Sequence, residues 1–466
     1  MHNQNSVRMA LLSLSMELYR KTIPGTIPKY VAFHETLAGK LATMGAVVAQ
    51  GLCYTRQEVE AAVASAEAGG AEVLVVVFQS YHPSLNALSA LANTRLPLLF
   101  WNTQRLSGIG ADFSVNDMLE NHGMHGVQDL CSCLRGAGRN FGIVSGHYED
   151  KAHLEELNYR VRACAAVSFG RQMKVGMLGR PLEGMGDFLV NPTSLQSHWG
   201  PSIQRISVSE LGDEVERAAP EEITGAMEHD RSLFDFAPDI TEEDHRRSAR
   251  LTVALRQIVR SNGLQAFTQH FGLYGEDARC ETCPFLAINH LVAEGVGYAG
   301  EGDVLTAALD ATLGYVFGRS SFCEMFTADF ERNRVFFYHM GEGNYTMARH
   351  GQKPLLKKVP YTFGNGHPYL APVFTYAPGP STFVNIAPDG ASGFRLIAFE
   401  AEVTDWSCVD RLTAPHFTIE IRGKLGDLLD AYSMEGGTHH LSRVEGRQAG
   451  RLQHLARMLE MELVLI

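Results

Sequence analysis

Apolar runs of strand length alternate with amphipathic segments along the first third of the chain. The strand-like runs occupy residues 8–16, 72–80, 96–104, 140–148 and 173–179. The segments between them, such as "TRQEVEAAVASAEAGG", repeat apolar residues at the intervals of a helix. This alternation predicts a parallel sheet that is covered by helices.

Polar and aromatic residues stand at the carboxyl ends of these predicted strands. In parallel sheets, ligands bind outside the carboxyl ends of the strands. The residues at these positions are Glu17, Tyr19, Tyr81, His82, Asn102, Gln104 and His147. They predict a rim suited to a hydroxylated ligand. No GxGxxG motif follows a predicted strand, so a dinucleotide is not indicated.

The rest of the chain divides into two parts, the first with helical patterns and the second with mostly strand-like segments. The first part contains the helical patterns "TEEDHRRSARLTVALRQIVRSNG" and "PFLAINHLVAEG", with the strand-like "LQAFTQHF" between them. From about residue 331, β-rich segments follow one another across turns, which is typical of an antiparallel sandwich or barrel. A helix is predicted over 441–461, before a short strand.

These patterns predict an α/β fold class, with two doubly wound α/β domains followed by an antiparallel β-rich, barrel-like C-terminal domain. The predicted boundaries are 1–171 for an N-terminal Rossmann-like domain, 172–330 for a central α/β domain and 331–466 for the C-terminal domain.

Charge and composition narrow the class of partner. The net charge is −12 and the acids are dispersed, which disfavours nucleic acid or a membrane as the partner. No run reaches the roughly 18 apolar residues of a membrane span, and the N-terminal stretch is interpreted as a first strand rather than a signal peptide. The eight cysteines lack the spacing of a disulfide scaffold, and the CxxC pair is interpreted as free thiols. We therefore expect a cytoplasmic protein.

The stretch "GYAGEGDVLTAAL" places two acids, Glu301 and Asp303, in a glycine turn before an apolar helix. Asp303 suits the capping position of that helix. Glu301 lies outside the helix between two glycines, which allow close approach of the backbone to a ligand. Glu301 is therefore a candidate ligand-contacting residue, against the ordinary alternative of a solvated loop glutamate.

Three further segments hold an acid or imidazoles. Glu324 lies in an apolar strand-like run, where a carboxylate is rarely left unpaired. His339 ends the apolar run "RVFFYH", and His439 and His440 follow two glycines. Each has an ordinary explanation alone, as a core histidine or a surface pair. Together, two carboxylates and two imidazoles suit octahedral Mn²⁺, Co²⁺ or Mg²⁺ better than a closed structural zinc site, although their spacing leaves open whether they converge.

Four motifs, in order, resemble those of the L-arabinose isomerase family, within the L-fucose/L-arabinose isomerase group. "PFLAINHLVAEGVGYAGEGDVLTAAL" resembles the family's helix–EGD–helix segment, "FCEMFTADFE" its FMEDYTYHFE, "YHMGE" its AHMLE and "GGTHH" its GGAHH. In that family these motifs hold a catalytic Mn²⁺. The resemblance implies that the metal ligands are Glu301 and Glu324 in the central domain and His339 and His440 in the C-terminal domain, and that the two glutamates are also catalytic.

Looser motifs resemble the family's sugar site. "MELY", "NHGMHG" and "AFTQHF" are similar to QHLY, NQxAHG and AFTTxF. With the strand-end tyrosine and the first histidine of "GGTHH", the predicted substrate-binding residues are Met16, Leu18, Tyr19, Tyr81, His122, His125, Thr268, Phe271 and His439. Met16 and His122 each replace a glutamine of the family pattern. The chain is therefore interpreted as a divergent member whose sugar differs from L-arabinose at its distal carbons.

The implied activity is that of an intramolecular oxidoreductase, an aldose–ketose isomerase acting on a pentose, hexose or related sugar. One carboxylate would take the C2 proton and an acid would return a proton at C1, through an enediol. Which glutamate is the base is left open. The resemblance also implies a homotrimer or homohexamer, in which the N-terminal domain of one subunit closes the pocket of its neighbour.

Two alternatives to an isomerase remain at this point. A metal-dependent epimerase or aldol-type lyase would use the same enediolate chemistry. A non-catalytic sugar-binding protein would use the same scaffold without needing the four implied metal ligands.

Overall fold

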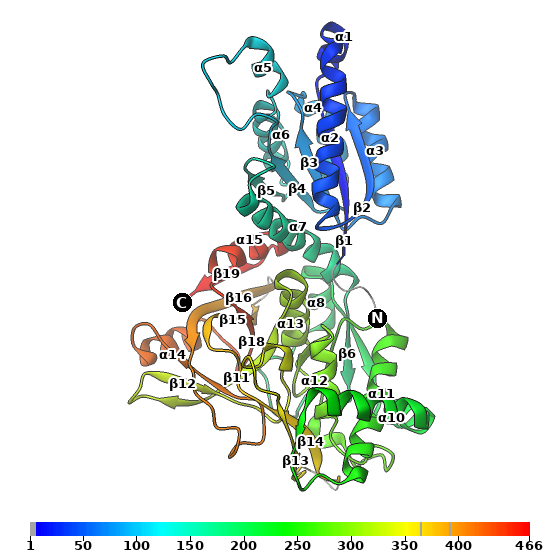
Figure 1. The fold of residues 1–466 in the computed structure, drawn as a ribbon, viewed down its shortest axis with the longest axis vertical. Helices are drawn as coiled ribbons and strands as arrows, with labels where there is room; N and C mark the ends of the chain where they lie inside the picture. The colour runs from blue at the N-terminus through cyan, green and yellow to red at the C-terminus, as the bar shows by residue number, and fades with distance from the viewer. Residues whose placement is uncertain (1–5, 364–365, 391–392) are drawn as a thin grey trace. The chain divides into compact units, whose positions relative to one another are not determined.

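The computed structural model describes residues 6–363, 366–390 and 393–466, so the first residues of the predicted N-terminal strand segment lie outside it. The chain divides into two compact units (Figure 1). The first comprises Met1–Phe169 with Arg457–Leu459, and the second comprises Gly170–Ala456 with Glu460–Ile466. The predicted division into three domains stays a prediction.

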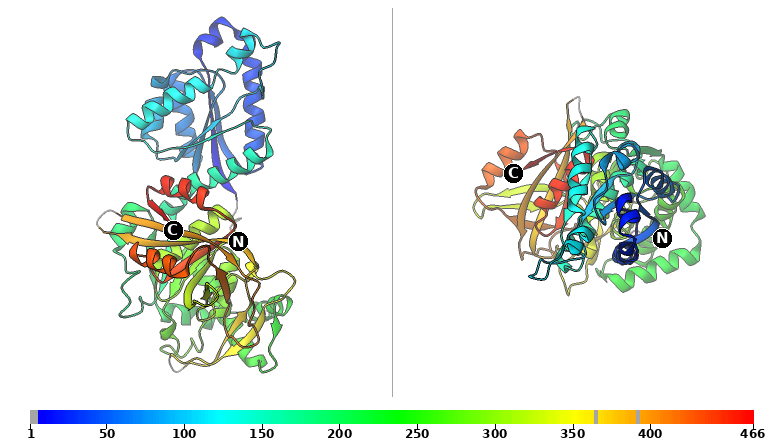
Figure 2. Two further views of the ribbon diagram at one scale, coloured as in Figure 1. Left: turned by 90° about the vertical axis from the view of Figure 1, so that its left-hand side faces the viewer. Right: turned by 90° about the horizontal axis from the view of Figure 1, so that it is seen from above.

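The first unit is built on a parallel sheet with strand order β2-β1-β3-β4-β5. The strands are β1 (Val7–Leu14), β2 (Gly45–Cys53), β3 (Val73–Phe78), β4 (Leu98–Asn102) and β5 (Gly142–Ser145). Helices cover both faces of the sheet, as Figure 2 shows. They are α2 (Ile27–Ala42), α3 (Arg56–Ala68), α4 (Ser84–Asn93), α6 (Met124–Gly136) and α7 (Lys151–Gln172).

The chain order reverses between β1 and β3 in this sheet, so the crevice where ligands bind in such folds lies at their carboxyl ends. Met16 follows β1, and the residues after it form the short helix α1 (Glu17–Thr22). Another short helix, α5 (Val115–Glu120), precedes α6. Strand β2 is absent from the elements predicted from sequence, because it is an edge strand of mostly half-buried residues without clean alternation.

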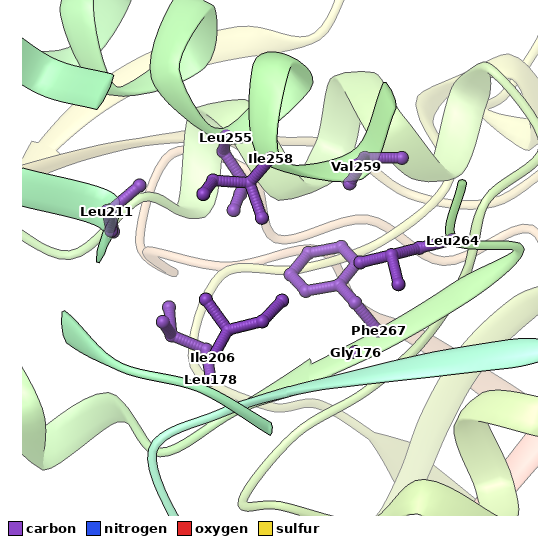
Figure 3. Close-up of a pocket in the computed structure, with 9 residues that line it drawn as sticks. All are labelled: Gly176, Leu178, Ile206, Leu211, Leu255, Ile258, Val259, Leu264 and Phe267. Atoms are coloured by element: carbon purple, nitrogen blue, oxygen red, sulfur yellow. The ribbon is translucent and has the colours of Figure 1, made fainter. Parts of the chain in front are cut away.

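The second unit begins with another parallel sheet, ordered β10-β9-β6-β7. The strands are β6 (Lys174–Leu178), β7 (Ser202–Ile206), β9 (Ala266–Gln269) and β10 (Gly297–Ala299). The helices of this part are α8 (Pro192–His198), α9 (Val208–Arg217), α10 (Pro220–Leu233), α11 (Glu242–Asn262), α12 (Phe285–Ala293) and α13 (Val304–Phe317). A small cavity between the sheet and helices α9 and α11 is lined by apolar residues such as Leu178, Ile206 and Phe267 (Figure 3). Its lining offers no polar side chain to recognise a ligand.

An antiparallel sheet completes the second unit. Its order is β15-β18-β11-β12-β17-β16, and β15 pairs with β16, so this sheet closes into a barrel, while β19 adds in parallel to β16. The strands are β11 (Ser321–Asp329), β12 (Arg334–Phe337), β15 (Gly379–Asp389), β16 (Gly393–Val403), β17 (Phe417–Glu420), β18 (His440–Glu445) and β19 (Glu462–Leu465). Rings of Phe337, Phe383 and Phe417 stack in its core. The predicted fold class is therefore confirmed.

One predicted element, the helix over residues 441–461, differs from the structure. A side sheet joins β8 (Asp235–Phe236), β13 (Leu355–Val359) and β14 (Tyr369–Val373), and helix α14 (Leu425–Met434) precedes β18. The helix predicted over 441–461 is wrong in its first part, because His440–Glu445 pairs with β11 and β15 as a strand. The helix there, α15, spans only Ala449–Leu459.

A search of the described helices finds none that is long and apolar enough to cross a membrane.

Candidate metal and sugar site

Two carboxylates and two imidazoles that are distant in sequence converge in the second unit. His339 Nε2 lies 3.3 Å from Glu324 Oε2 and 3.9 Å from Glu301 Oε1. His440 Nε2 lies 3.4 Å from Glu301 Oε2. The structure therefore brings Glu301, Glu324, His339 and His440 into one neighbourhood, in which each glutamate lies near at least one of the two imidazoles.

Glu301 reaches this centre from a strained turn at the carboxyl end of β10. The N–H of Asp303 donates to the carbonyl of Gly300 (3.0 Å), and the central residues Glu301 and Gly302 have φ angles of +64° and +87°. A positive φ costs a non-glycine residue roughly 1–2 kcal/mol, and such strain is concentrated at functional sites. Gly302 has no alternative, since a Cβ there would lie 2.4 Å from Pro181 Cα.

Strand pairing positions Glu324 and His440. In the antiparallel pair β11–β18, Glu324 is directly opposite His440, and opposed residues of this kind project to the same face. His339 follows the end of β12, which pairs with the other edge of β11. The barrel therefore supplies three of the four groups, and the parallel sheet supplies Glu301.

A second carboxylate lies against Nδ1 of each buried imidazole. His440 Nδ1 lies 2.9 Å from Asp303 Oδ2, while Asp303 Oδ1 accepts the N–H of Thr306 and caps α13. His339 Nδ1 lies 2.9 Å from Glu342 Oε1. This arrangement leaves Nε2 of both rings for a metal, as is usual for metal-bound histidines.

The supporting acids were not predicted in this role. Asp303 was assigned only as a helix cap, which it also is. Glu342 could have been predicted to lie near His339, because it follows that histidine by three residues in "HMGE". It is buried and also accepts hydrogen bonds from Tyr298 Oη (3.2 Å) and the N–H of Gly341 (2.8 Å).

The neighbouring acids change the pKa of the imidazoles. Burial lowers the pKa of His339, but the Glu342 carboxylate outweighs this effect and raises the pKa to about 9. Burial likewise lowers the pKa of His440, and the hydrogen bond to Asp303 raises it above its ordinary value.

The two glutamates shift in opposite directions. Burial favours a higher pKa for Glu301, but the adjacent imidazoles of His439 and His440 hold this pKa well below its usual range. Burial raises the pKa of Glu324 above its ordinary value, and the charge of His339 offsets only part of that rise. Opposed shifts in adjacent carboxyls are common where one site needs both an acid and a base.

The donor set fits a divalent ion. Two groups of potential ligands share His440: one with Glu301 and His439, the other with Glu324 and His339. Nε2 of His440 is buried and makes no hydrogen bond to any described residue. A buried, unsatisfied nitrogen facing carboxylates is stabilised by a cation, and mixed carboxylate–imidazole sets suit Mn²⁺, Co²⁺ or Mg²⁺.

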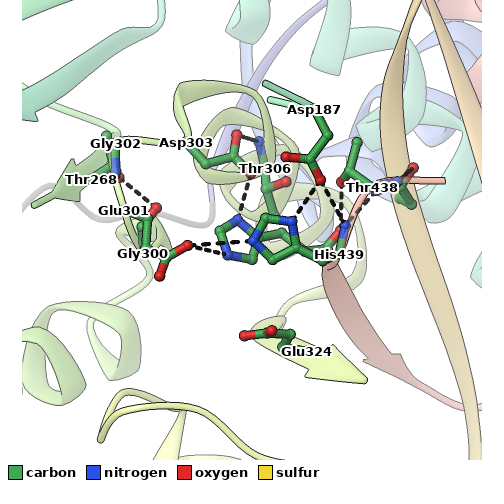
Figure 4. A network of polar contacts seen from close by, with 12 residues as sticks. Asp187, Thr268, Gly300, Glu301, Gly302, Asp303, Thr306, Glu324, Thr438 and His439 are labelled. Atoms are coloured by element: carbon green, nitrogen blue, oxygen red, sulfur yellow. Dashed lines mark hydrogen bonds and ion pairs between the residues drawn. The ribbon is translucent and has the colours of Figure 1, made fainter. Parts of the chain in front are cut away.

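His439 lies beside the centre (Figure 4) and is half-buried. Its Nε2 is 3.4 Å from Glu301 Oε2. Its Nδ1 is 2.6 Å from Asp187 Oδ2, in the loop that follows β6, and its backbone N–H donates to the same oxygen (3.1 Å). Next in the chain, the buried Phe188 stacks on His440, with ring centroids 5.4 Å apart. No sequence motif pointed to Asp187 or Phe188.

Two other predicted sugar-site residues, Thr268 and Phe271, lie in or just after strand β9. Thr268 is fully buried, and its hydroxyl donates to the Gly300 carbonyl (3.2 Å) and accepts from the N–H of Gly302 (3.0 Å). It therefore supports the turn that carries Glu301. Phe271 follows β9, is half-buried and packs edge-on against Phe363 (4.6 Å).

The remaining predicted sugar-site residues cluster in the first unit, at the carboxyl ends of β1 and β3. His122 Nε2 lies 2.5 Å from His125 Nδ1, and His122 Nδ1 lies 3.5 Å from Tyr19 Oη. Tyr81 Oη donates to Asp129 (3.1 Å). The cluster is completed by two apolar side chains, the half-buried Met16 and the exposed Leu18.

Comparison with known proteins gives a consistent result. Residues 191–317 match the family model of the L-arabinose isomerase central domain, and residues 319–462 match that of the L-arabinose isomerase C-terminal domain. The chain is 27% identical to the L-arabinose isomerase of Nocardioides sp., over 84% of this chain and 80% of the relative. It is also 27% identical to that of Geobacillus thermodenitrificans, with the same coverage, and 24% identical to that of Shouchella clausii, over 79% and 76%.

Proposed function

The chain belongs to the L-arabinose isomerase family, and from that premise we propose that it is a metal-dependent aldose–ketose isomerase that works through an enediol. Membership makes it a sugar isomerase, an intramolecular oxidoreductase. The observation that carries the metal-dependent part is the convergence of Glu301, Glu324, His339 and His440, with an acid behind each imidazole.

These four residues would hold the divalent ion, with Mn²⁺ as the first candidate and Co²⁺ or Mg²⁺ as alternatives. When bound, the ion supplies stabilisation of negative charge on the sugar oxygens O1 and O2. Asp303 and Glu342 keep the two imidazoles in the orientation that exposes Nε2. The strained turn keeps Glu301 aimed at the centre before any sugar arrives.

The two glutamates are the groups that would move protons. One carboxylate takes the proton from C2, and an acid returns a proton at C1, so that an aldose becomes a ketose without external oxidant. Glu301 and Glu324 approach the centre from different sheets, which supports action from two sides of the sugar. Their opposed pKa shifts support paired acid and base roles.

The first-unit cluster is proposed to recognise the sugar's distal carbons. Met16 and His122 stand where the family pattern has glutamines, so we propose a substrate other than L-arabinose. We also propose that Tyr19, Tyr81 and His125 act on the site of a neighbouring subunit, within a homotrimer or homohexamer.

A sugar panel tests the proposed activity. Metal-stripped protein is incubated with aldopentoses and aldohexoses, with and without Mn²⁺, and ketose formation is measured. We expect Mn²⁺-dependent ketose formation from at least one sugar. Epimer or cleavage products without ketose, or no product from any sugar, would contradict it.

A further inference from the structure

Three histidines around the centre share one arrangement but differ in exposure. Each has a carboxylate against Nδ1: Asp303 for His440 (2.9 Å), Glu342 for His339 (2.9 Å) and Asp187 for His439 (2.6 Å). The side chains of His440 and His339 are 0% and 7% exposed, whereas that of His439 is 32% exposed. The first two are enclosed as metal ligands are, whereas the third is partly accessible to solvent.

Asp187 fixes the direction of the His439 ring. One carboxylate oxygen accepts both the backbone N–H (3.1 Å) and Nδ1–H (2.6 Å) of His439. Two bonds to one acceptor restrain the side-chain torsions of the histidine. The opposite nitrogen, Nε2, then points to Glu301 Oε2 at 3.4 Å. A carboxylate behind an imidazole sets which nitrogen carries the proton and where the other one points.

Resting on the proposed isomerase function, we propose that Asp187 is a positioning residue that holds His439 Nε2 against the sugar oxygens next to Glu301, without contributing to metal binding. Asp187 stands in the loop that follows β6. Asp187 lies before residue 191, where the match to the central-domain family model begins.

A purely structural role for Asp187 is disfavoured by its surroundings. Its side chain is 38% exposed in a loop, so its removal empties no core. The loop is tied to the site independently of Asp187, because Phe188 stacks on His440 and the N–H of Leu182 donates to the Glu301 carbonyl (2.8 Å). Replacing Asp187 therefore releases His439 while the loop stays in place.

The test compares Asp187→Ala, Asp187→Asn and the control Asp239→Ala, an exposed aspartate elsewhere in the same unit. Mn²⁺ affinity and stoichiometry are measured by isothermal titration calorimetry, and kcat and KM are measured with the best sugar of the panel. We expect Asp187→Ala to lower kcat at least tenfold, with KM, stoichiometry and Mn²⁺ Kd within about threefold of wild type. Asp187→Asn should recover part of the loss, because its amide oxygen still accepts the same hydrogen bonds. The control should match wild type.

Two results would overturn the inference while leaving the isomerase activity intact. A tenfold weaker Mn²⁺ affinity in Asp187→Ala would mean that Asp187 acts through the metal. A kcat within twofold of wild type would mean that it does not position a reacting group. Wild-type protein that forms no ketose from any sugar would instead overturn the proposed function, and this inference with it.

Discussion

Each compact unit gathers histidines among its candidate site residues, but the two groups are built differently. In the second unit, His339 and His440 are buried and each faces a carboxylate. In the first unit, His122 instead faces His125 (2.5 Å) and Tyr19 (3.5 Å).

The pKa of each imidazole follows these partners. Carboxylates raise the pKa of His339 to about 9 despite burial. Burial, together with the charge of His125, lowers the pKa of His122. The imidazoles of the second unit are thus held by carboxylates in a buried site, whereas His122 lies in a half-buried cluster and has, among the described residues, no carboxylate against its ring. The comparison suits chemistry in the second unit and sugar selection in the first.

The largest expected effect comes from removing two of the proposed metal ligands in the second unit. The double variant Glu324→Ala, His440→Ala should lose its metal and fall in kcat by roughly a thousandfold or more, since charge stabilisation and a proton-transfer group are both lost. Metal content per chain and ketose formation measure this. The exposed His350→Ala is the control and should keep both. Full metal occupancy in the double variant would refute the ligand assignment.

Mixing subunits tests whether the two regions act across chains. His125→Ala and the ligand double variant should each be nearly inactive, and co-refolding them in equal amounts should restore about a quarter of wild-type activity. In a randomly mixed symmetric oligomer, half of the centres are intact, and half of these lie beside a neighbour with an intact first-unit cluster, which gives one quarter. Light scattering gives the oligomeric state. An active monomer, or no recovery in verified mixed oligomers, would contradict action across subunits.

A more moderate loss of metal affinity is expected when Asp303, which lies against the proposed ligand His440, is changed. Asp303→Asn should weaken Mn²⁺ binding about 10- to 100-fold, because His440 loses its charged partner. Asparagine still caps a helix well, so thermal unfolding of the metal-free variant should match wild type. Unchanged Mn²⁺ affinity by calorimetry would show that Asp303 serves only as the cap of α13.

The first unit should affect sugar preference instead. In the proposed sugar site, the apolar side chain of Met16 would leave a sugar hydroxyl without a partner, at a cost of about 1–3 kcal/mol, or roughly ten- to a hundredfold. We expect L-arabinose to be a poor substrate of wild type and Met16→Gln to raise its kcat/KM about tenfold. Values of kcat/KM across aldopentoses and aldohexoses test this. The idea fails if wild type prefers L-arabinose and the variant leaves the ranking unchanged.

The smallest expected effect is the shifted pKa of His122 in the first-unit cluster. Burial and the charge of His125 lower the folded pKa of His122, so its ring should become charged at a lower pH than an ordinary histidine does. NMR titration of the metal-free protein measures this, and His122→Gln assigns the signal by removing it. A His122 pKa above 6.5 would erase the contrast with the second unit.

The amino-acid sequence determined the order of strands and helices and the residue types of the centre. Both can be read from short stretches of sequence. An apolar run such as "EVLVVVFQS" indicates a strand that is buried on both faces, and the glycines of "GEGD" indicate a tight turn. The same locality explains the errors. The half-buried edge strand β2 carries a weak pattern, and the segment 441–445 is a strand because β11 and β15 lie on either side of it.

Only the tertiary structure decided which side chains meet. Glu324 faces His440 because two antiparallel strands pair in one register, and a shift by one residue would turn either side chain away. Asp187 meets His439 across 252 positions of sequence, and nothing in either segment alone encodes that distance. The positive φ of Glu301 depends on the packing of its turn against Pro181 and Thr268. Such contacts are set by the pairing and packing of whole elements, so the sequence identified candidate ligands by residue type, while the fold determined the partners that lie against them.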